Sequence, residues 1–138
     1  MTEKYLIDTS IWVDLYDDRK GFRNEPLGSY ALQLLVKITA KNSKIVLTDH
    51  LIRELEVNYS SEEISGMFKP FEKQIEKMIV TREQREQAKA IASEQKVPRG
   101  DALHAITARD NNLILITRDK HFKQLQDISR HYKPEDII

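Results

Sequence analysis

Four carboxylates are spaced so that a parallel sheet would bring them together. Asp8 directly follows the apolar run 5–7, and Asp119 lies three residues beyond the apolar run that ends at residue 116. Asp101 begins a helical pattern just before that second run, and Glu54 lies in a helical pattern after another apolar run. Residues that follow parallel strands lie outside the carboxyl ends of those strands, at one edge of the sheet. We therefore expect the four acids to meet at this edge.

Converging carboxylates repel one another, so such a site persists only where a cation compensates the charge or where protons are retained. The sequence contains no cysteine, and oxygen ligands alone favour Mg²⁺ or Mn²⁺ over structural zinc. A divalent ion held by carboxylates can lower the pKa of a bound water and stabilise charge on a phosphoryl oxygen. Taken singly, Asp8, Asp101 and Asp119 also fit helix caps, and Glu54 fits a solvated helix face. The prediction of a metal site therefore depends on their combination.

The elements that must position these acids alternate between strand and helix. Predicted strands cover residues 5–7, 45–47 and 113–116, with a further possible strand at 79–80. Predicted helices cover residues 30–40, 49–59, 61–78, 81–95, 101–110 and, briefly, 121–125. Residues 17–28 carry charges, a proline and two glycines, and are expected to form a loop. This alternation predicts an α/β fold, a three-layer α/β/α sandwich with a small parallel sheet.

Length and composition limit the possible functions. The 138 residues fit a single domain, 1–138, and the 22 basic residues balance the 22 acidic ones. Zero net charge argues against nonspecific nucleic-acid binding by bulk charge, so a nucleic-acid role must rest on local charge segregation. No segment approaches the ~20 apolar residues that a membrane helix needs, and no signal-peptide core is present. We therefore expect a cytoplasmic protein.

Four segments resemble the motifs of PIN-domain proteins, in the order and spacing of that family. They are Leu6-Ile7-Asp8-Thr9-Ser10, Arg53-Glu54-Leu55, Gly100-Asp101-Ala102-Leu103-His104-Ala105, and Ile116-Thr117-Arg118-Asp119 with Phe122. The resemblance extends from about residue 5 to residue 134, and its most specific part lies between residues 100 and 122. It implies a small PIN-like α/β fold and a Mg²⁺- or Mn²⁺-dependent ribonuclease that leaves 5′-phosphate and 3′-hydroxyl products. The family includes the toxins of VapBC-type toxin–antitoxin pairs and RNA-processing nucleases.

The resemblance also implies roles for individual residues. The implied catalytic and metal-binding acids are Asp8, Glu54, Asp101 and Asp119, and the implied supporting hydroxyls are those of Ser10 and Thr117. Glu56 is the alternative to Glu54, but a helix turns about 200° between them, and the apolar pattern favours Glu54. The implied partners are an RNA substrate, an antitoxin protein and a second copy of the chain in a homodimer.

A basic rim around the acidic pocket is expected to hold substrate phosphates. Residues 118–133 contain five basic residues against two acidic ones, a net charge of +3. Arg118 and Lys120 flank Asp119 and are candidate substrate-binding residues, together with Arg99. His104 lies one turn after Asp101 and fits either a substrate contact or a structural hydrogen bond. The other histidines, His50, His121 and His131, show no spacing typical of a metal site.

Two other functions fit parts of the sequence. A PIN-like module without catalysis could bind RNA or a protein, but the presence of all four acids counts against it. A receiver-like phosphoacceptor domain also has an acidic pocket, but it needs a lone aspartate after a middle strand. Here Thr48 and Asp49 follow the second predicted strand and directly cap a helix. The ribonuclease is therefore the preferred interpretation.

Overall fold

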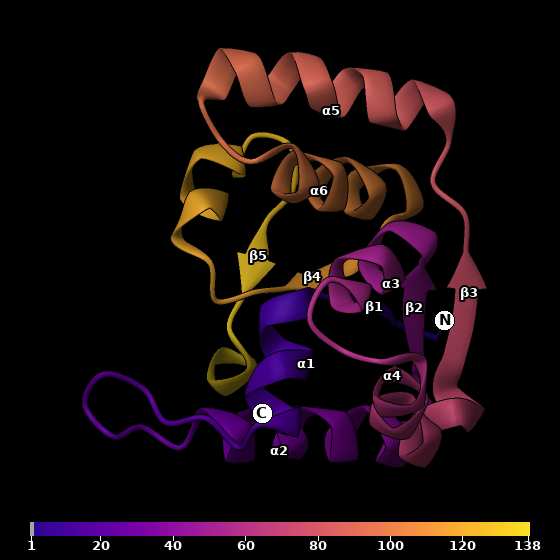
Figure 1. The fold of residues 1–138 in the computed structure, drawn as a ribbon, viewed down its shortest axis with the longest axis vertical. Helices are drawn as coiled ribbons and strands as arrows, with labels where there is room; N and C mark the ends of the chain where they lie inside the picture. The colour runs from indigo at the N-terminus through magenta and orange to yellow at the C-terminus, as the bar shows by residue number, and fades with distance from the viewer. Residues whose placement is uncertain (1) are drawn as a thin grey trace.

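The computed structural model describes residues 2–138. Its centre is a five-stranded parallel sheet with the strand order β3-β2-β1-β4-β5 (Figure 1). The strands are β1 (Lys4–Ile7), β2 (Lys44–Thr48), β3 (Ile75–Met78), β4 (Ile114–Ile116) and β5 (His131–Tyr132). The α-helices are α1 (Thr9–Tyr16), α2 (Leu27–Ala40), α3 (Asp49–Glu56), α4 (Ser61–Phe68), α5 (Arg82–Gln95) and α6 (Arg99–Asn111). Short 3₁₀ helices are η1 (Lys69–Gln74), η2 (Lys120–Leu125) and η3 (Pro134–Asp136).

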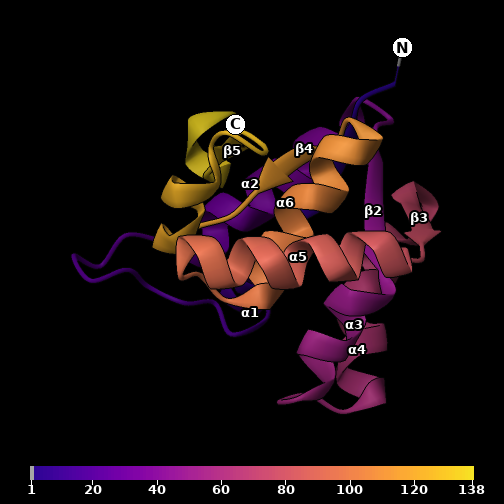
Figure 2. The same ribbon diagram turned by 90° about the horizontal axis from the view of Figure 1, so that it is seen from above.

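Helices cover both faces of the sheet, which confirms the predicted three-layer α/β/α architecture. Tyr5 and Ile7 of β1 pack on one face against α1, α2, α3 and α4. Leu6 packs on the other face against α5, α6 and η2, because successive strand residues point to opposite faces. Seen from above, α5 lies across α6 (Figure 2). In the described part of the chain, no helix combines the length and the apolar character that a membrane span requires.

The central strand β1 determines where the site lies. Leu6 of β1 is in register with Val46 of β2 and with Leu115 of β4. The pairing continues past the end of β1, where the main-chain N–H of Asp8 donates to the carbonyl oxygen of Ile116 at 2.8 Å. Asp8 and the segment after β4 therefore leave the sheet side by side, at the edge that the sequence predicts.

The helices begin where the sequence offers caps. The hydroxyl of Thr48 accepts a hydrogen bond from the main-chain N–H of Leu51 at 3.0 Å and starts α3 directly after β2. Thr81 forms a capping box with Gln84 at the start of α5. Because the cap of α3 lies at the carboxyl end of β2, the first turns of α3 lie at the same edge of the sheet as Asp8.

The predicted helix 61–78 and the predicted strand 79–80 are wrong in this region. The α-helix ends at Phe68, and the third strand is Ile75–Met78. Pro70 lies at the start of the intervening 3₁₀ helix, because proline lacks the N–H that an α-helix interior requires. Ile75 and Met78 fit a helical repeat in the sequence, yet they belong to an edge strand with few buried positions.

Trp12 belongs to the core and is 1% exposed. Its indole N–H donates to the carbonyl oxygen of Ile7 at 3.2 Å. The ring of Phe68 packs edge-on against it, with ring centroids 4.8 Å apart, and Met67 and Phe71 are also buried in this cluster. The apolar repeat of α4 and η1 therefore contributes to the core.

Candidate metal centre

Asp8 is held at the end of β1 by two hydroxyl groups. Its Oδ2 atom accepts hydrogen bonds from the Ser10 hydroxyl at 2.9 Å and from the Thr117 hydroxyl at 2.8 Å. The side chain is nearly buried, and its Oδ1 atom lies 3.5 Å from Nε2 of His104. Two neutral donors thus orient one oxygen of Asp8, which leaves the other oxygen facing into the site. Ser10 and Thr117 lie where the family resemblance places the supporting hydroxyls.

Glu54 enters the site from α3. Its Oε1 atom accepts hydrogen bonds from the Thr9 hydroxyl and from Nε2 of His104, both at 2.7 Å. Burial by itself raises the pKa of Glu54, but the hydrogen bond and positive charge of His104 outweigh burial and lower this pKa to about 2. Glu56 is exposed, so the structure brings Glu54 to the other acids and leaves Glu56 away from them.

Asp101 and Asp119 lie close together, each with a carboxylate oxygen beside His121. Asp101 lies in the first turn of α6, and its Oδ2 atom is buried without a hydrogen-bond partner among the described residues. Asp119 caps η2, where its Oδ1 atom accepts from the main-chain N–H of His121 at 2.9 Å. Burial and the negative charges of Asp119 and Asp8 raise the pKa of Asp101 to about 7. The neighbouring histidines therefore compensate only part of the electrostatic repulsion that Asp8 and Asp119 exert on Asp101.

Histidines contribute more to this site than their sequence spacing indicates. Two groups place three possible ligand atoms within 4.8 Å of one another, and these groups are His50 with Glu54 and His104, and Asp101 with Asp119 and His121. The spacing of His50 and His121 in the sequence is not typical of a metal site, yet the fold places each of them beside two other possible ligand atoms. One signal was available, because His50 and Glu54 are four residues apart on one helix face. The contact of His104 with Glu54 spans 50 residues and depends on the packing of α6 against α3.

The residues present fit a divalent cation. The unpartnered Oδ2 atom of Asp101 and the raised pKa of its carboxyl both mark a position where positive charge is missing. The nearby donors are carboxylate oxygens of Asp8 and Asp119 with one imidazole, a set that suits Mg²⁺ or Mn²⁺. A cation bound here would replace the proton on Asp101 and satisfy its buried oxygen.

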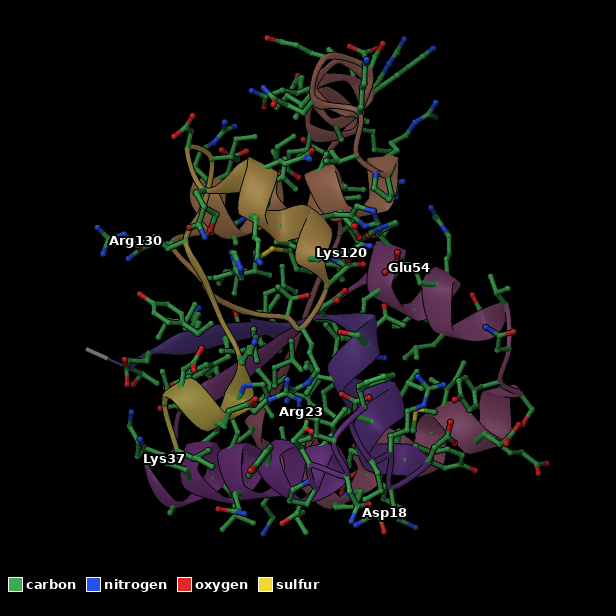
Figure 3. The ribbon with its side chains drawn as sticks, turned by 90° about the vertical axis from the view of Figure 1, so that its left-hand side faces the viewer. Asp18, Arg23, Lys37, Glu54, Lys120 and Arg130 are labelled. Carbon is green, nitrogen blue, oxygen red and sulfur yellow. The ribbon has the colours of Figure 1, made fainter. Side chains whose placement is uncertain are left out.

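The basic residues around the pocket differ in their availability. The Arg118 guanidinium donates two hydrogen bonds to Glu135, both at 2.7 Å, and its Nε atom lies 3.3 Å from Asp14. These contacts occupy the guanidinium of Arg118, whose side chain is 18% exposed, and its expected role in substrate binding stays a prediction. Lys120 and Arg99 are exposed. In Figure 3, Lys120 on η2 and Glu54 on α3 lie beside the N-terminal end of α1.

Replacing Arg118 with methionine is expected to destabilise the fold by about 2 kcal/mol. The change leaves Asp14, whose side chain is 6% exposed, without its positive neighbour, and it breaks the bidentate contact with Glu135. Loss of one partner of a fully buried pair costs about 3–5 kcal/mol, and the partial exposure of Glu135 reduces this value. Urea unfolding measures the difference. The matched control is Arg82→Met, because Arg82 pairs with Glu86 on the surface, and equal destabilisation by both changes would contradict the prediction.

Several solved structures have a fold similar to that of this chain. A toxin–antitoxin complex from Klebsiella pneumoniae has a chain with 23% sequence identity and a TM-score of 0.59, over 94% of this chain and 97% of that one. The VapBC2 complex of Rickettsia felis, bound to a DNA fragment from its promoter, has a chain with 18% identity and a TM-score of 0.62, over 88% and 92%. PAE2754 from Pyrobaculum aerophilum has 16% identity and a TM-score of 0.60, over 99% and 93%.

These identities are low, and the likeness concerns the fold. No curated protein sequence matches the chain significantly. The sequence profile of the PIN domain, by contrast, matches residues 5–128, a range that includes Asp8, Glu54, Asp101 and Asp119. Since this match covers most of the sequence, the chain belongs to the PIN domain family.

Proposed function

We propose that this protein is a divalent-metal-dependent ribonuclease that hydrolyses RNA phosphodiester bonds. The observation that carries the proposal is the closeness of Asp8 and Asp119 to Asp101, whose buried Oδ2 atom has no hydrogen-bond partner in the described structure. Glu54 is linked to Asp8 through His104. Nδ1 of His121 lies 3.3 Å from the Oδ2 atom of Asp101 but forms no hydrogen bond with it, and a buried carboxylate oxygen without a hydrogen bond is unusual in a site built only for stability. Membership of the PIN family, whose members are generally nucleases, supports the same activity.

In the proposed reaction, Asp8, Asp101 and Asp119 hold Mg²⁺ or Mn²⁺. Such an ion, when bound, would supply a water of lowered pKa and stabilise negative charge on the phosphoryl oxygen. Ser10 and Thr117 keep Asp8 in its orientation, and Thr9 and His104 do the same for Glu54. With a pKa of about 2, Glu54 is too weak a base to accept a proton efficiently near neutral pH.

The remaining residues act through position and charge. Glu54 orients the ligands around the ion or the attacking water through its second carboxylate oxygen, which lies 3.5 Å from Nε2 of His50. Lys120 and Arg99 lie exposed beside the pocket, where their positive charges would contact the phosphates on either side of the scissile bond. In-line attack on the phosphorus then leaves 5′-phosphate and 3′-hydroxyl ends.

We also propose that the ribonuclease is the toxin of a toxin–antitoxin pair. Two of the similar structures are toxin–antitoxin complexes, and they align over at least 88% of this chain. The partner would be an antitoxin protein that inhibits the nuclease, and a second copy of the chain would complete a homodimer. Co-expression with the product of an adjacent small reading frame tests this step, because an antitoxin should bind the protein and suppress its RNA cleavage.

The decisive experiment is cleavage of a labelled single-stranded RNA by the purified protein. We expect cleavage with Mg²⁺ or Mn²⁺, none with EDTA, and recovery when the metal is restored. Glu54→Gln should reduce the rate by roughly 10–100-fold, as expected for loss of an outer-sphere partner of a metal. Asp8→Asn removes a proposed metal ligand and should reduce the rate by more than about a hundredfold. Glu56→Gln is the matched control and should cleave at the wild-type rate. Cleavage that survives both EDTA and Asp8→Asn would refute the proposal.

A further inference from the structure

The loop between α1 and α2, residues 17–26, extends away from the body of the protein (Figures 1 and 2). Near its tip, Phe22 is fully exposed, although a phenyl ring this accessible loses the stabilisation that burial would provide. Arg19, Lys20 and Arg23 surround it. The loop as a whole carries no net charge, because Asp17, Asp18 and Glu25 balance these three basic residues. Asp17 and Asp18 lie at its base, where Asp17 is 3.6 Å from Arg19, so Lys20 and Arg23 are the cations on either side of Phe22.

The loop is held in shape by its own hydrogen bonds. The main-chain N–H of Gly21 donates to the carbonyl oxygen of Glu25 at 2.7 Å, and that of Asn24 donates back to Gly21 at 2.9 Å. The Glu25 carboxylate accepts from the main-chain N–H of Arg23 at 2.7 Å. This turn presents Phe22 outward, and the ring joins neither core cluster of the fold.

The base of the loop lies at the C-terminal end of α1, the helix whose N-terminal end carries Asp8. The main-chain N–H of Arg19 donates to the carbonyl oxygen of Asp14 at 3.0 Å, and Asp14 contacts Arg118, the neighbour of Asp119. The eight residues of α1 separate the loop from Asp8 by ~12 Å. In Figure 3, Arg23 of the loop appears on the same side of the molecule as Lys120 and Arg130.

We propose that the α1–α2 loop binds the single-stranded RNA substrate, with a base stacked on Phe22 and phosphates contacted by Lys20 and Arg23. This inference rests on the proposed function and specifies how the substrate is held. An exposed aromatic ring among cations is the combination that binds single strands without reading their sequence. The base of the loop lies ~12 Å from Asp8, which corresponds to about four stacked nucleotides at 3.4 Å each, and Phe22 lies farther along the loop. The loop would therefore hold RNA several nucleotides from the scissile bond.

The test compares long and short RNA. Phe22→Ala should raise KM for a single-stranded 12-nucleotide RNA about tenfold, within the range expected for losing one base–aromatic stack. It should leave kcat unchanged, as well as the kcat/KM for a trinucleotide too short to reach the loop. Phe22→Tyr, which keeps an aromatic ring, should have the wild-type KM. Phe22→Leu, which keeps only an apolar side chain, should have a KM as high as that of Phe22→Ala. A wild-type KM for Phe22→Leu would overturn the stacking role, and an unchanged KM for Phe22→Ala would overturn the proposal.

Control variants and the salt dependence of RNA affinity distinguish the roles of Phe22, Lys20 and Arg23 from general surface effects. Ile79→Ala removes another highly exposed apolar side chain and should change nothing. Lys20→Gln and Arg23→Gln should each reduce the slope of log affinity against log salt by about one, whereas Arg82→Gln on α5 should leave it unchanged. A change in oligomeric state on Phe22→Ala, without a change in RNA affinity, would show that the loop binds a second copy and would overturn the proposal.

Binding is also measured separately from cleavage, by fluorescence anisotropy of the labelled 12-nucleotide RNA. The assay uses Asp101→Asn as the background, because the proposed function predicts that this variant does not cut the RNA. If the wild-type protein cleaves no RNA but Phe22 still controls affinity, the nuclease proposal fails and the loop proposal stands. If cleavage occurs and Phe22 has no effect on affinity or KM, the loop proposal alone fails.

Discussion

Asp101→Asn is expected to make the metal-free protein more stable while reducing RNA cleavage by at least about a hundredfold. Burial and the charges of Asp119 and Asp8 raise the pKa of Asp101 to about 7, against an ordinary value of 3.8. The folded protein therefore disfavours the ionised carboxylate, which the unfolded chain tolerates freely. An amide of the same shape removes this penalty, and it also removes the charge that binds the metal.

The stability difference between the wild type and Asp101→Asn is expected to depend on pH. Below about pH 4, the carboxyl is protonated in both states, and the wild type and the variant should be equally stable. Between about pH 4 and pH 7 the unfolded state releases its proton while the folded state retains it, so the wild type loses stability relative to the variant. Above pH 7 the difference in unfolding free energy should reach a plateau of roughly 2–4 kcal/mol. Asp101→Asn should then melt on the order of 10 °C above the wild type.

Thermal unfolding in EDTA and in Mg²⁺ measures both effects. Metal should raise the melting temperature of the wild type, because binding to the folded state alone stabilises it, and should have little effect on Asp101→Asn. Asp110→Asn is the control on the same helix. Hydrogen bonds from Gln84 and Arg109 lower the pKa of Asp110, so its replacement should destabilise slightly. A variant at Asp101 that melts at or below the wild-type temperature at pH 8 would contradict the prediction.

His104→Leu is expected to destabilise the fold by about 3 kcal/mol near pH 6, the loss typical of breaking a buried ion pair. The imidazole is 1% exposed and lies between two carboxylates, at 2.7 Å from Glu54 and 3.5 Å from Asp8. Burial lowers the pKa of His104, but the hydrogen bond to Glu54 and the charge of Asp8 raise it above its usual value overall. Leucine leaves both carboxylates without this positive partner.

The stabilisation from this pair has a defined pH window. The contribution of His104 is complete below about pH 6.5 and declines as the pH rises through its folded-state pKa. The contribution of Glu54 is complete above about pH 4.5 and declines as the pH falls towards its folded-state pKa of about 2. Urea unfolding should therefore show the largest loss for His104→Leu between about pH 4.5 and pH 6.5. His104→Gln, which keeps a donor in place of Nε2, should lose less.

His131 provides a control of the opposite sign. Burial lowers its pKa, so the folded state favours the neutral ring and the contribution of His131 grows as the pH rises. His131→Gln should therefore cost less at pH 5 than at pH 8, whereas His104→Leu should cost more at pH 5 than at pH 8. If the cost of His104→Leu does not depend on pH, His104 is neutral in the folded protein and the assigned ion pair is wrong.

Much of the fold could be predicted from the sequence because its signals are local. The apolar runs at β1, β2 and β4, and the caps Thr48 and Thr81, depend only on neighbouring residues, and the structure confirms them. The alternation of strand and helix then implied a parallel sheet with the acids at one edge. The region 61–78 could not be predicted in the same way, since its apolar residues fit a helical repeat as well as an edge strand.

The sequence alone determined the α/β architecture, the edge of the sheet where the acids lie, and the chemistry that oxygen ligands favour. Only the tertiary structure decided how those acids are supported. Thr117 contacts Asp8 across 109 residues, His104 contacts Glu54 across 50 residues, and the guanidinium of Arg118 binds Glu135. These contacts depend on how helices and loops pack, and the pKa of Asp101 depends on the burial and charge that this packing creates. Local patterns therefore locate the site, and long-range packing sets its electrostatics.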